Sequence, residues 1–124
     1  FPPKIIINMI KKNSLRCGIA IKPKTPFKVV EKYLSFIDYI VIMSVEPGFG
    51  GQSFIPSTLE KIASIDATLK EKNMRDKIAI QVDGGIKMHN AKEVIDAGTD
   101  ILVAGSEVFK SENPIETINE MYNL

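Results

Sequence analysis

Four short apolar runs recur along the chain, and each is followed by a segment whose apolar residues have helical spacing. The runs cover residues 17–21, 39–43, 78–82 and 101–104. Short continuous apolar runs are typical of strands that helices cover on a parallel sheet. The alternation therefore predicts an α/β fold built from four βα units with parallel strands.

The segments around the runs predict the helices. We expect them over residues 3–12, 26–34, 57–72 and 90–97, and from Pro114 onward. Thr25 and Asn113 are the expected caps of two of them, and Ser57 with Glu60 has the spacing of a capping box. The residues expected to face inward are Ile5, Ile6, Met9 and Ile10; Phe27, Val30, Tyr33 and Leu34; Leu59, Ile62, Ala63 and Leu69; and Ile115, Ile118, Met121 and Tyr122.

Three of the four apolar runs end in loops that contain glycine. A residue without a Cβ lets backbone N–H groups approach a ligand closely, as phosphate binding requires. In parallel α/β folds, ligands bind at the carboxyl ends of the strands, where these loops lie. The loops therefore predict a phosphate site that is lined by Gly48, Gly50 and Gly51, by Gly84 and Gly85, and by Gly105 and Ser106.

Asp83 is the strongest candidate for chemistry, because it follows the third apolar run directly. A carboxylate at a strand end can ligate a metal or transfer a proton, although aspartate before glycine is also a common turn residue. The neighbouring glycine loops favour a functional role.

Ser106 is expected to cap a helical turn over residues 107–109. Met43 is expected either to fill the core or to line the site, and His89, the only histidine, to be solvated or to cap a helix.

Length and composition leave two architectures open. The chain has 124 residues, of which 44% are hydrophobic and 25% are charged, as in one ordinary domain. A complete (β/α)₈ barrel needs roughly 250 residues. The alternatives are therefore an open doubly wound sheet or about half of a barrel. Phe1 in place of an initiator methionine leads us to expect a fragment or a processed product.

The apolar runs, the cysteine content and the distribution of charge limit the kinds of partner that the chain is expected to bind. No apolar run approaches the ~20 residues of a membrane span, and the single cysteine, Cys17, excludes an internal disulfide. Residues 1–40 hold eight of the 16 basic side chains and two of the 15 acidic ones. No aromatic residues are interleaved with these basic residues, so we expect solvated helix faces rather than nucleic-acid binding. We therefore expect a cytoplasmic protein that binds neither membrane nor nucleic acid.

Three segments carry a resemblance to a known family. They are Val41-Ile42-Met43-Ser44-Val45-Glu46-Pro47-Gly48-Phe49-Gly50-Gly51-Gln52, Val82-Asp83-Gly84-Gly85-Ile86 and Val103-Ala104-Gly105-Ser106. With them the sequence resembles the ribulose-phosphate 3-epimerases. The loosest part of the match is residues 18–23, because the family usually has asparagine where Lys22 stands.

The resemblance implies an isomerase with a (β/α)₈ TIM barrel. Residues 1–124 would be the C-terminal half of that barrel, roughly the fifth to eighth βα units preceded by the end of the fourth helix. The implied reaction interconverts D-ribulose 5-phosphate and D-xylulose 5-phosphate in the pentose phosphate pathway. In the family, two aspartates transfer protons at C3 and a divalent metal assists; zinc, iron(II), manganese and cobalt are the candidates.

The resemblance also assigns roles to individual residues. Asp83 matches the aspartate that is both acid/base and metal ligand, and Met43 matches a methionine that lines the pocket. The residues that match substrate and phosphate contacts are Gly48, Phe49, Gly50, Gly51, Gly84, Gly85, Gly105 and Ser106. The family's other metal ligands, two histidines and an aspartate, and its early serine have no counterpart here. We therefore expect an incomplete metal site and an inactive isolated chain.

The expected partners follow from the same resemblance and from the edges of the predicted sheet. The substrate would be a sugar phosphate. The strands at 17–21 and 101–104 would be open edges, which tend to pair with another chain. We therefore expect a homo-oligomer or pairing with an N-terminal half. The alternatives are an epimerase acting on a ketohexose 6-phosphate, and a non-catalytic half-barrel that binds phosphate ligands or a partner chain.

Overall fold

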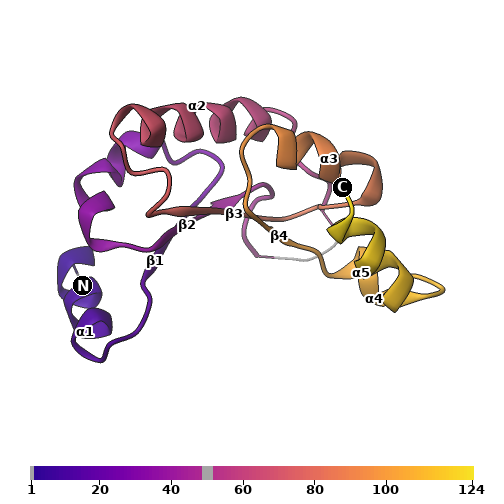
Figure 1. Ribbon diagram of the computed structural model, residues 1–124, viewed down its shortest axis with the longest axis horizontal. Helices are drawn as coiled ribbons and strands as arrows, with labels where there is room; N and C mark the ends of the chain where they lie inside the picture. The colour runs from indigo at the N-terminus through magenta and orange to yellow at the C-terminus, as the bar shows by residue number, and fades with distance from the viewer. Residues whose placement is uncertain (1, 49–51) are drawn as a thin grey trace.

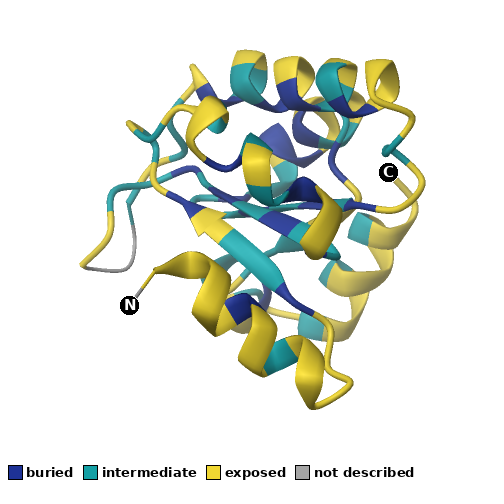
Figure 2. Ribbon diagram, turned by 90° about the vertical axis from the view of Figure 1, so that its left-hand side faces the viewer, coloured by how far each residue is buried: buried dark blue, intermediate teal, exposed yellow. Residues whose placement is uncertain are grey.

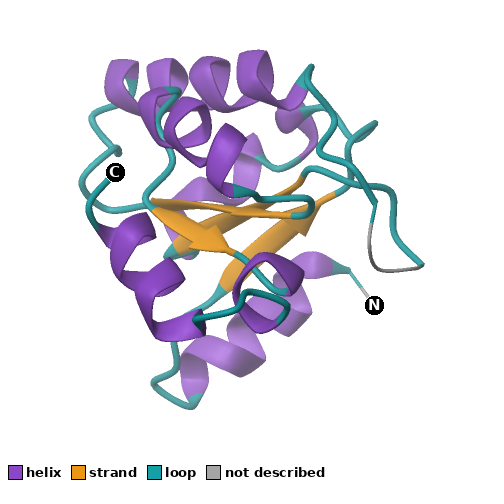
Figure 3. Cartoon of the chain, turned by 90° about the vertical axis from the view of Figure 1, so that its right-hand side faces the viewer, coloured by secondary structure: helices purple, strands orange, loops and turns teal. Residues whose placement is uncertain are grey.

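The computed structural model describes residues 2–48 and 52–124, and its centre is one parallel sheet (Figure 3). The sheet has four strands in the order β1-β2-β3-β4. They are β1 (Gly18–Ile21), β2 (Tyr39–Met43), β3 (Ala79–Asp83) and β4 (Ile101–Val103). Each strand pairs in parallel with the next one in sequence. This order confirms the predicted α/β pattern and places β1 and β4 at the edges.

Strand β2 has the predicted bounds, and the other strands differ by one residue at one or both ends. The most consequential difference is in β3, which ends at Asp83 instead of Val82. Asp83 pairs with Met43 on one side and with Val103 on the other. The carboxylate therefore projects from the last residue of a strand held between two others, rather than from a loop.

The helices form an arc along one side of the sheet, from α1 past α2 and α3 to α5 (Figure 1). Their bounds are α1 (Pro3–Lys12), η1 (Phe27–Val29), η2 (Glu31–Phe36), α2 (Thr58–Glu71), α3 (Met88–Asp96), α4 (Ser106–Phe109) and α5 (Pro114–Tyr122). The bounds of α1 agree with the prediction. The cap of α5 is also as predicted, because Asn113 Oδ1 accepts a hydrogen bond from Glu116 N at 3.2 Å.

One predicted helix is wrong, and the predicted capping bond of another is not formed. The segment expected as one α-helix from Pro26 forms the two 3₁₀ helices η1 and η2, and Thr25 does not cap them. The β-branched pair Val29-Val30 has low helix propensity, which is consistent with the break between them. The expected capping box of Ser57 is not formed either. Ser57 already has helical dihedral angles, and a preceding turn supplies backbone acceptors for the first N–H groups of α2.

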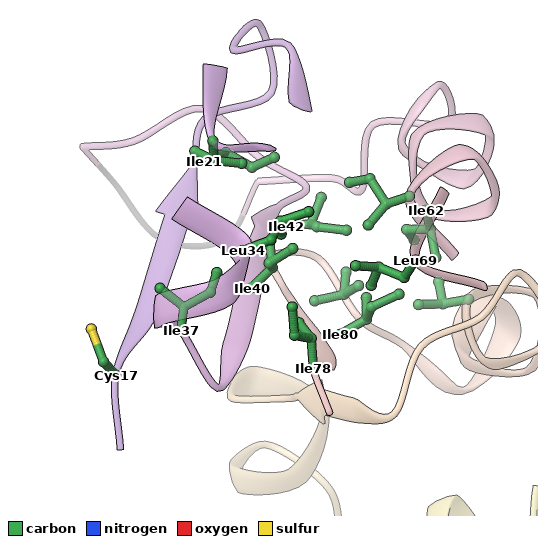
Figure 4. Packing of buried hydrophobic residues seen from close by; sticks show 14 of the residues in the cluster. Cys17, Ile21, Leu34, Ile37, Ile40, Ile42, Ile62, Leu69, Ile78 and Ile80 are labelled. Carbon is green, nitrogen blue, oxygen red and sulfur yellow. The ribbon is translucent and has the colours of Figure 1, made fainter. Parts of the chain in front are cut away.

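The core lies between the sheet and the arc of helices. Ile40 and Ile42 of β2 and Ile80 of β3 are completely buried there. In Figure 4, Ile62 and Leu69 of α2 point toward these strand residues. The inward prediction for α2 fails at one position: Ile65 is buried and Ala63 is exposed. Burying each of these isoleucines contributes roughly 1.5–3 kcal/mol to the free energy of unfolding. The face of the sheet that packs against the helices therefore supplies most of its stability.

The opposite face of the sheet is only partly covered. Val41, Met43, Gln81, Asp83 and Val103 point to it in register, and all five are half-buried. No helix of the described part of the chain crosses this face (Figure 1). Parallel sheets are normally covered on both faces. A curved parallel sheet with helices on its convex side alone is the arrangement expected of part of a TIM barrel.

Several residues predicted to face inward are instead exposed, as the burial colours of the terminal helices show (Figure 2). In α1, Ile5, Ile6 and Met9 are exposed and Ile7 is the buried residue. In α5, Ile115 and Tyr122 are 73% and 87% exposed. The amphipathic pattern correctly marked apolar faces, but only part of each face packs against the core, through Ile7 and Ile10 of α1 and Met121 of α5.

A charged cluster holds the amino ends of the strands together. Arg75 Nε lies 2.6 Å from the carboxylate of Asp66 on α2, and Arg75 Nη2 lies 2.9 Å from Asp100, which precedes β4. The same guanidinium donates to the carbonyls of Ile78 and Gly98 at 3.1 and 2.8 Å. One side chain therefore connects α2 to the segments that enter β3 and β4, at the end of the sheet opposite the glycine loops.

Two carboxylates at this end are expected to make stability fall in acid. Cys17 N donates to Asp38 at 2.7 Å, and this bond lowers the pKa of Asp38 from its ordinary 3.8. Burial raises the pKa of Asp66, but hydrogen bonds from Lys70 and Arg75 outweigh it, so the net pKa is also lowered from 3.8. As the pH falls, the unfolded chain takes up these protons first. The stability from both groups is therefore complete well above pH 3.8 and is lost below it.

Urea unfolding between pH 7 and pH 3 measures this effect. We expect the urea concentration at the unfolding midpoint to decrease as the pH is lowered below about 4. The decrease should be smaller in Asp66→Asn, because its amide takes up no proton in this pH range. Asp96→Asn, on the exposed side of α3, is the matched control. An unchanged pH dependence in Asp66→Asn would contradict the role given to the Arg75 cluster.

Candidate functional site

The carboxyl ends of β2, β3 and β4 surround one open cleft of about 470 Å³. Its lining includes every described residue that the sequence predicted for the site: Met43, Gly48, Asp83, Gly84, Gly85, Gly105 and Ser106. Phe49, Gly50 and Gly51 lie outside the described residues. Segments that are far apart in sequence thus meet at one place, because the carboxyl ends of parallel strands share one edge of the sheet.

The Asp83 carboxylate is the chemical group at the floor of the cleft. Met43, Asp83 and Val103 are paired across the three strands, so their side chains form one row. Asp83 is half-buried. Within residues 2–48 and 52–124, its side chain makes no hydrogen bond or ion pair. Both carboxylate oxygens are therefore available for a substrate or an ion.

The two glycines after Asp83 are required by the backbone. Gly84 has φ +131° and Gly85 has φ +68°, a region that favours glycine. A Cβ on Gly84 would lie 2.6 Å from Val45 Cγ2, and a Cβ on Gly85 would lie 2.8 Å from Phe54 Cα. These glycines let the loop after β3 pack directly on the loop after β2, which fixes the wall of the cleft beside Asp83.

Two polar residues that the sequence analysis missed hold this loop. The Ser44 hydroxyl, fully buried, donates to the Gly84 carbonyl at 2.5 Å. Asn90 Nδ2 donates to the Gly85 carbonyl at 2.9 Å, and Asn90 Oδ1 accepts from Lys87 N at 2.8 Å. A serine after an apolar run was the only local signal for Ser44. Its bond crosses between neighbouring strands and depends on their register, so the sequence pattern alone did not reveal it.

Gly105 differs from the glycines after Asp83. Its φ is −98°, outside the left-handed region, and no atom of the described residues lies within 4 Å of a Cβ placed on it. Neither backbone conformation nor crowding within the described chain requires glycine there. The space beside Gly105 faces the cleft.

Ser106 has a different role from the predicted one. Gly105 is the residue that precedes α4, and no side chain caps this helix. The Ser106 hydroxyl instead accepts a hydrogen bond from Lys87 Nζ at 2.6 Å. Nearby, Glu107 Oε2 accepts from Met88 N at 2.6 Å, which joins α4 to the start of α3. The cleft therefore contains a lysine that the sequence analysis did not identify.

The donors present do not complete a metal site. Asp83 and Glu46 are the carboxylates among the described residues that line the cleft. No group of three or more histidine, cysteine, aspartate or glutamate side chains in the described chain is placed to hold an ion. His89 is exposed on α3 and lines a neighbouring hollow. The described residues therefore offer at most part of a ligand set. In the same residues, no helix is long and apolar enough to cross a membrane.

Two solved structures of flavocytochrome b2 have a similar fold. A double mutant of flavocytochrome b2 with pyruvate bound superposes with a TM-score of 0.64 at 22% identity, over 95% of this chain and 31% of that one. At this identity the similarity concerns the fold alone. A second flavocytochrome b2 structure, with sulfite bound, gives a TM-score of 0.60 at 21% identity, over 98% of this chain and 29% of that one.

Sequence comparison is more specific. The chain is 39% identical to the ribulose-phosphate 3-epimerase of Escherichia coli K12 over 93% of its length and 50% of that protein. It is 39% identical to the Bacillus subtilis enzyme of the same name, over 93% of this chain and 52% of that one. The chloroplastic ribulose-5-phosphate-3-epimerase of Arabidopsis thaliana is 43% identical, over 90% of this chain and 39% of that one.

The chain therefore spans about half the length, or less, of these curated relatives. A family model described as the ribulose-phosphate 3 epimerase family matches residues 2–109, which include β1 to β4 and the whole described cleft. The chain belongs to the ribulose-phosphate 3-epimerase family.

Proposed function

We propose that this chain supplies the phosphate-binding part and one acid/base residue of an enzyme that interconverts D-ribulose 5-phosphate and D-xylulose 5-phosphate. One observation carries the proposal: the available Asp83 carboxylate shares a cleft with the glycine-bearing ends of three parallel strands. The names of the relatives support this reaction over others that the fold could host.

The chemistry explains why one carboxylate is insufficient. Epimerisation at C3 begins when a base removes the C3 proton and the electron pair of that bond enters an enediolate with the C2 carbonyl. A proton then returns to C3 from the opposite face. Asp83 serves as the base or the acid on one face of the sugar. The second group has to approach from the other face of the sugar, and we expect it to come from residues beyond those described.

The resemblance implies a divalent metal, and Asp83 is the residue of this chain that would contribute a ligand. The described donors do not complete the set, so the other ligands would come from residues beyond those described. We therefore assign no step of the reaction to the ion. Zinc, iron(II), manganese and cobalt are to be compared by reconstitution.

We further propose that another half-barrel continues the sheet at its β4 edge and covers its open face, where Met43, Asp83 and Val103 are only half-buried. An apolar hollow of about 660 Å³ runs along the edge strand β4 between α4 and α5, and its lining includes the exposed residues Ile101, Phe109 and Tyr122. Edge strands and exposed apolar surface of this kind tend to associate. The cover is either more of the same polypeptide or a second copy of this chain.

An assay of the 124-residue chain with D-ribulose 5-phosphate tests the proposal, with each of the four metals supplied in turn. We expect binding of the sugar phosphate without turnover, and turnover once the remaining half of the Escherichia coli relative is added. Sedimentation of the same samples reports whether the open face is covered. The proposal would be overturned if the chain bound neither D-ribulose 5-phosphate nor inorganic phosphate.

A non-catalytic phosphate-binding half-barrel is the second candidate, and the incomplete set of metal donors favours it. Binding without turnover in every assembly would support this candidate over the epimerase.

A further inference from the structure

The charge of the cleft is unfavourable for a phosphate unless one residue compensates it. Glu46 and Asp83 are both acidic and both line the cleft. Lys87 is the single basic residue among the described residues of the lining. Without it, a phosphate dianion would enter a cleft whose fixed charges all repel it.

Lys87 is placed to act on a ligand rather than on the protein. Its backbone is fixed by the hydrogen bond from Lys87 N to Asn90 Oδ1 at 2.8 Å. Its ammonium group donates to Ser106 Oγ at 2.6 Å, and this bond connects the loop after β3 to the start of α4. In the described ranges of the chain, this ammonium makes no ion pair and no other hydrogen bond. Two of its three N–H donors are thus left for another acceptor.

The alternative interpretation is a solvated surface lysine, and Lys92 on α3, the helix that begins directly after Lys87, is an example. Lys92 is exposed and pairs with Asp96 one turn later, at 3.1 Å. Lys87 is instead half-buried and lies against a neutral hydroxyl in the cleft. A half-buried ammonium group without an acidic partner is stabilised when an anion binds beside it.

The hydroxyl of Ser106 completes the arrangement. Because Ser106 Oγ accepts the bond from Lys87, its own proton remains free to donate. The ammonium and the hydroxyl can then donate to two oxygens of one anion. Gly105, whose Cβ position is empty, leaves room beside them.

We propose that Lys87 and Ser106 form a paired phosphate-recognition site, in which Lys87 gives the cleft its preference for dianionic phosphate. This inference rests on the proposed function, because it assumes that a phosphate group enters the cleft. It adds a charged residue to a site that the sequence had assigned only to glycine backbone and Ser106.

Titration of the 124-residue chain with inorganic phosphate and with D-ribulose 5-phosphate, by calorimetry, tests the pair. Lys87→Met should weaken binding of both roughly 10- to 100-fold, the range expected for one charge-assisted hydrogen bond. Lys87→Arg should retain most of the affinity because it keeps the charge. Lys92→Met, which changes a lysine of α3 outside the cleft, is the matched control and should not change binding.

The dependence on salt and pH distinguishes recognition of charge from a structural role. In the unmodified chain, affinity for D-ribulose 5-phosphate should fall with added salt and rise as the second proton of its phosphate monoester is lost near pH 6. Both dependences should be weaker in Lys87→Met. This comparison remains valid even if the substitution shifts stability slightly, because each slope is measured within one variant.

The possible failures are distinguishable. If the unmodified chain binds phosphate and Lys87→Met binds equally well, with the same salt dependence, the role of Lys87 is wrong and the proposed function is unaffected. If binding to Lys87→Arg is as weak as to Lys87→Met, the charge is not what the site recognises. If the unmodified chain binds neither probe, both the pair and the proposed function are overturned.

Discussion

Replacement of Asp83 by asparagine is expected to reduce turnover of D-ribulose 5-phosphate in the assembled enzyme by a factor of ~10² to 10⁴, the usual contribution of a positioned acid/base. The amide keeps the shape of the side chain but cannot accept the C3 proton. Phosphate binding should be retained or slightly strengthened, since the phosphate contacts are expected at the glycine loops and at Ser106 and the substitution removes one negative charge from the same cleft.

The fold should tolerate this substitution. Among the described residues, nothing bonds to the Asp83 side chain, and its backbone carbonyl, which accepts from Ser44 N at 2.9 Å, is not altered. Asp96→Asn on the exposed side of α3 is the control for the loss of one negative charge. Turnover that survives in Asp83→Asn would show that another group transfers the proton. Parallel loss of turnover and of phosphate affinity would indicate a binding role instead.

The second large effect concerns stability. Gly85→Ala is expected to lower the free energy of unfolding by about 2–5 kcal/mol. A left-handed backbone conformation costs a residue with a Cβ roughly 1–2 kcal/mol, and overpacking adds about 1–3 kcal/mol. Gly85 has φ +68°, and its added methyl group would meet the backbone of Phe54, which cannot move aside like a flexible side chain. Urea unfolding, compared at equal m-values, measures the loss.

Gly105→Ala is the matched control, because it adds the same methyl group in the same cleft. With φ −98° and no described atom within 4 Å of the new Cβ, its stability should stay within about 0.5 kcal/mol of the parent. Equal destabilisation of the two variants would contradict the distinction between a glycine that the loop requires and a glycine that leaves space in the cleft.

The sheet and the position of the cleft were predictable for simple reasons. A continuous apolar run such as 39–43 is typical of a strand in a parallel sheet, and β2 has these bounds in the structure. Once the strands are parallel, the loops that follow them meet at one edge. The grouping of Met43, Asp83 and Gly105 around one cleft therefore follows from the order of elements along the chain.

The packing of the helices was less predictable. An amphipathic pattern marks an apolar face but does not say what covers it, which is why Ile5 and Ile115 were predicted to be inward and are exposed. The start of α2 was predicted correctly, with Ser57 before its first residue, but the capping bond was not. Its first N–H groups are satisfied by a turn that the backbone forms, so the hydroxyl of Ser57 is not needed as a cap.

By itself, the sequence determined the α/β pattern, the parallel strands, and the end of the sheet at which glycine and carboxylate gather. These depend on local periodicity and chain order. Only the tertiary structure decided that Ser44 and Asn90 hold the loop after Asp83, and that Lys87 reaches Ser106, 19 residues away. Hydrogen bonds between side chains on different elements depend on strand register and helix rotation to within an ångström, and periodicity in the sequence does not specify geometry that finely.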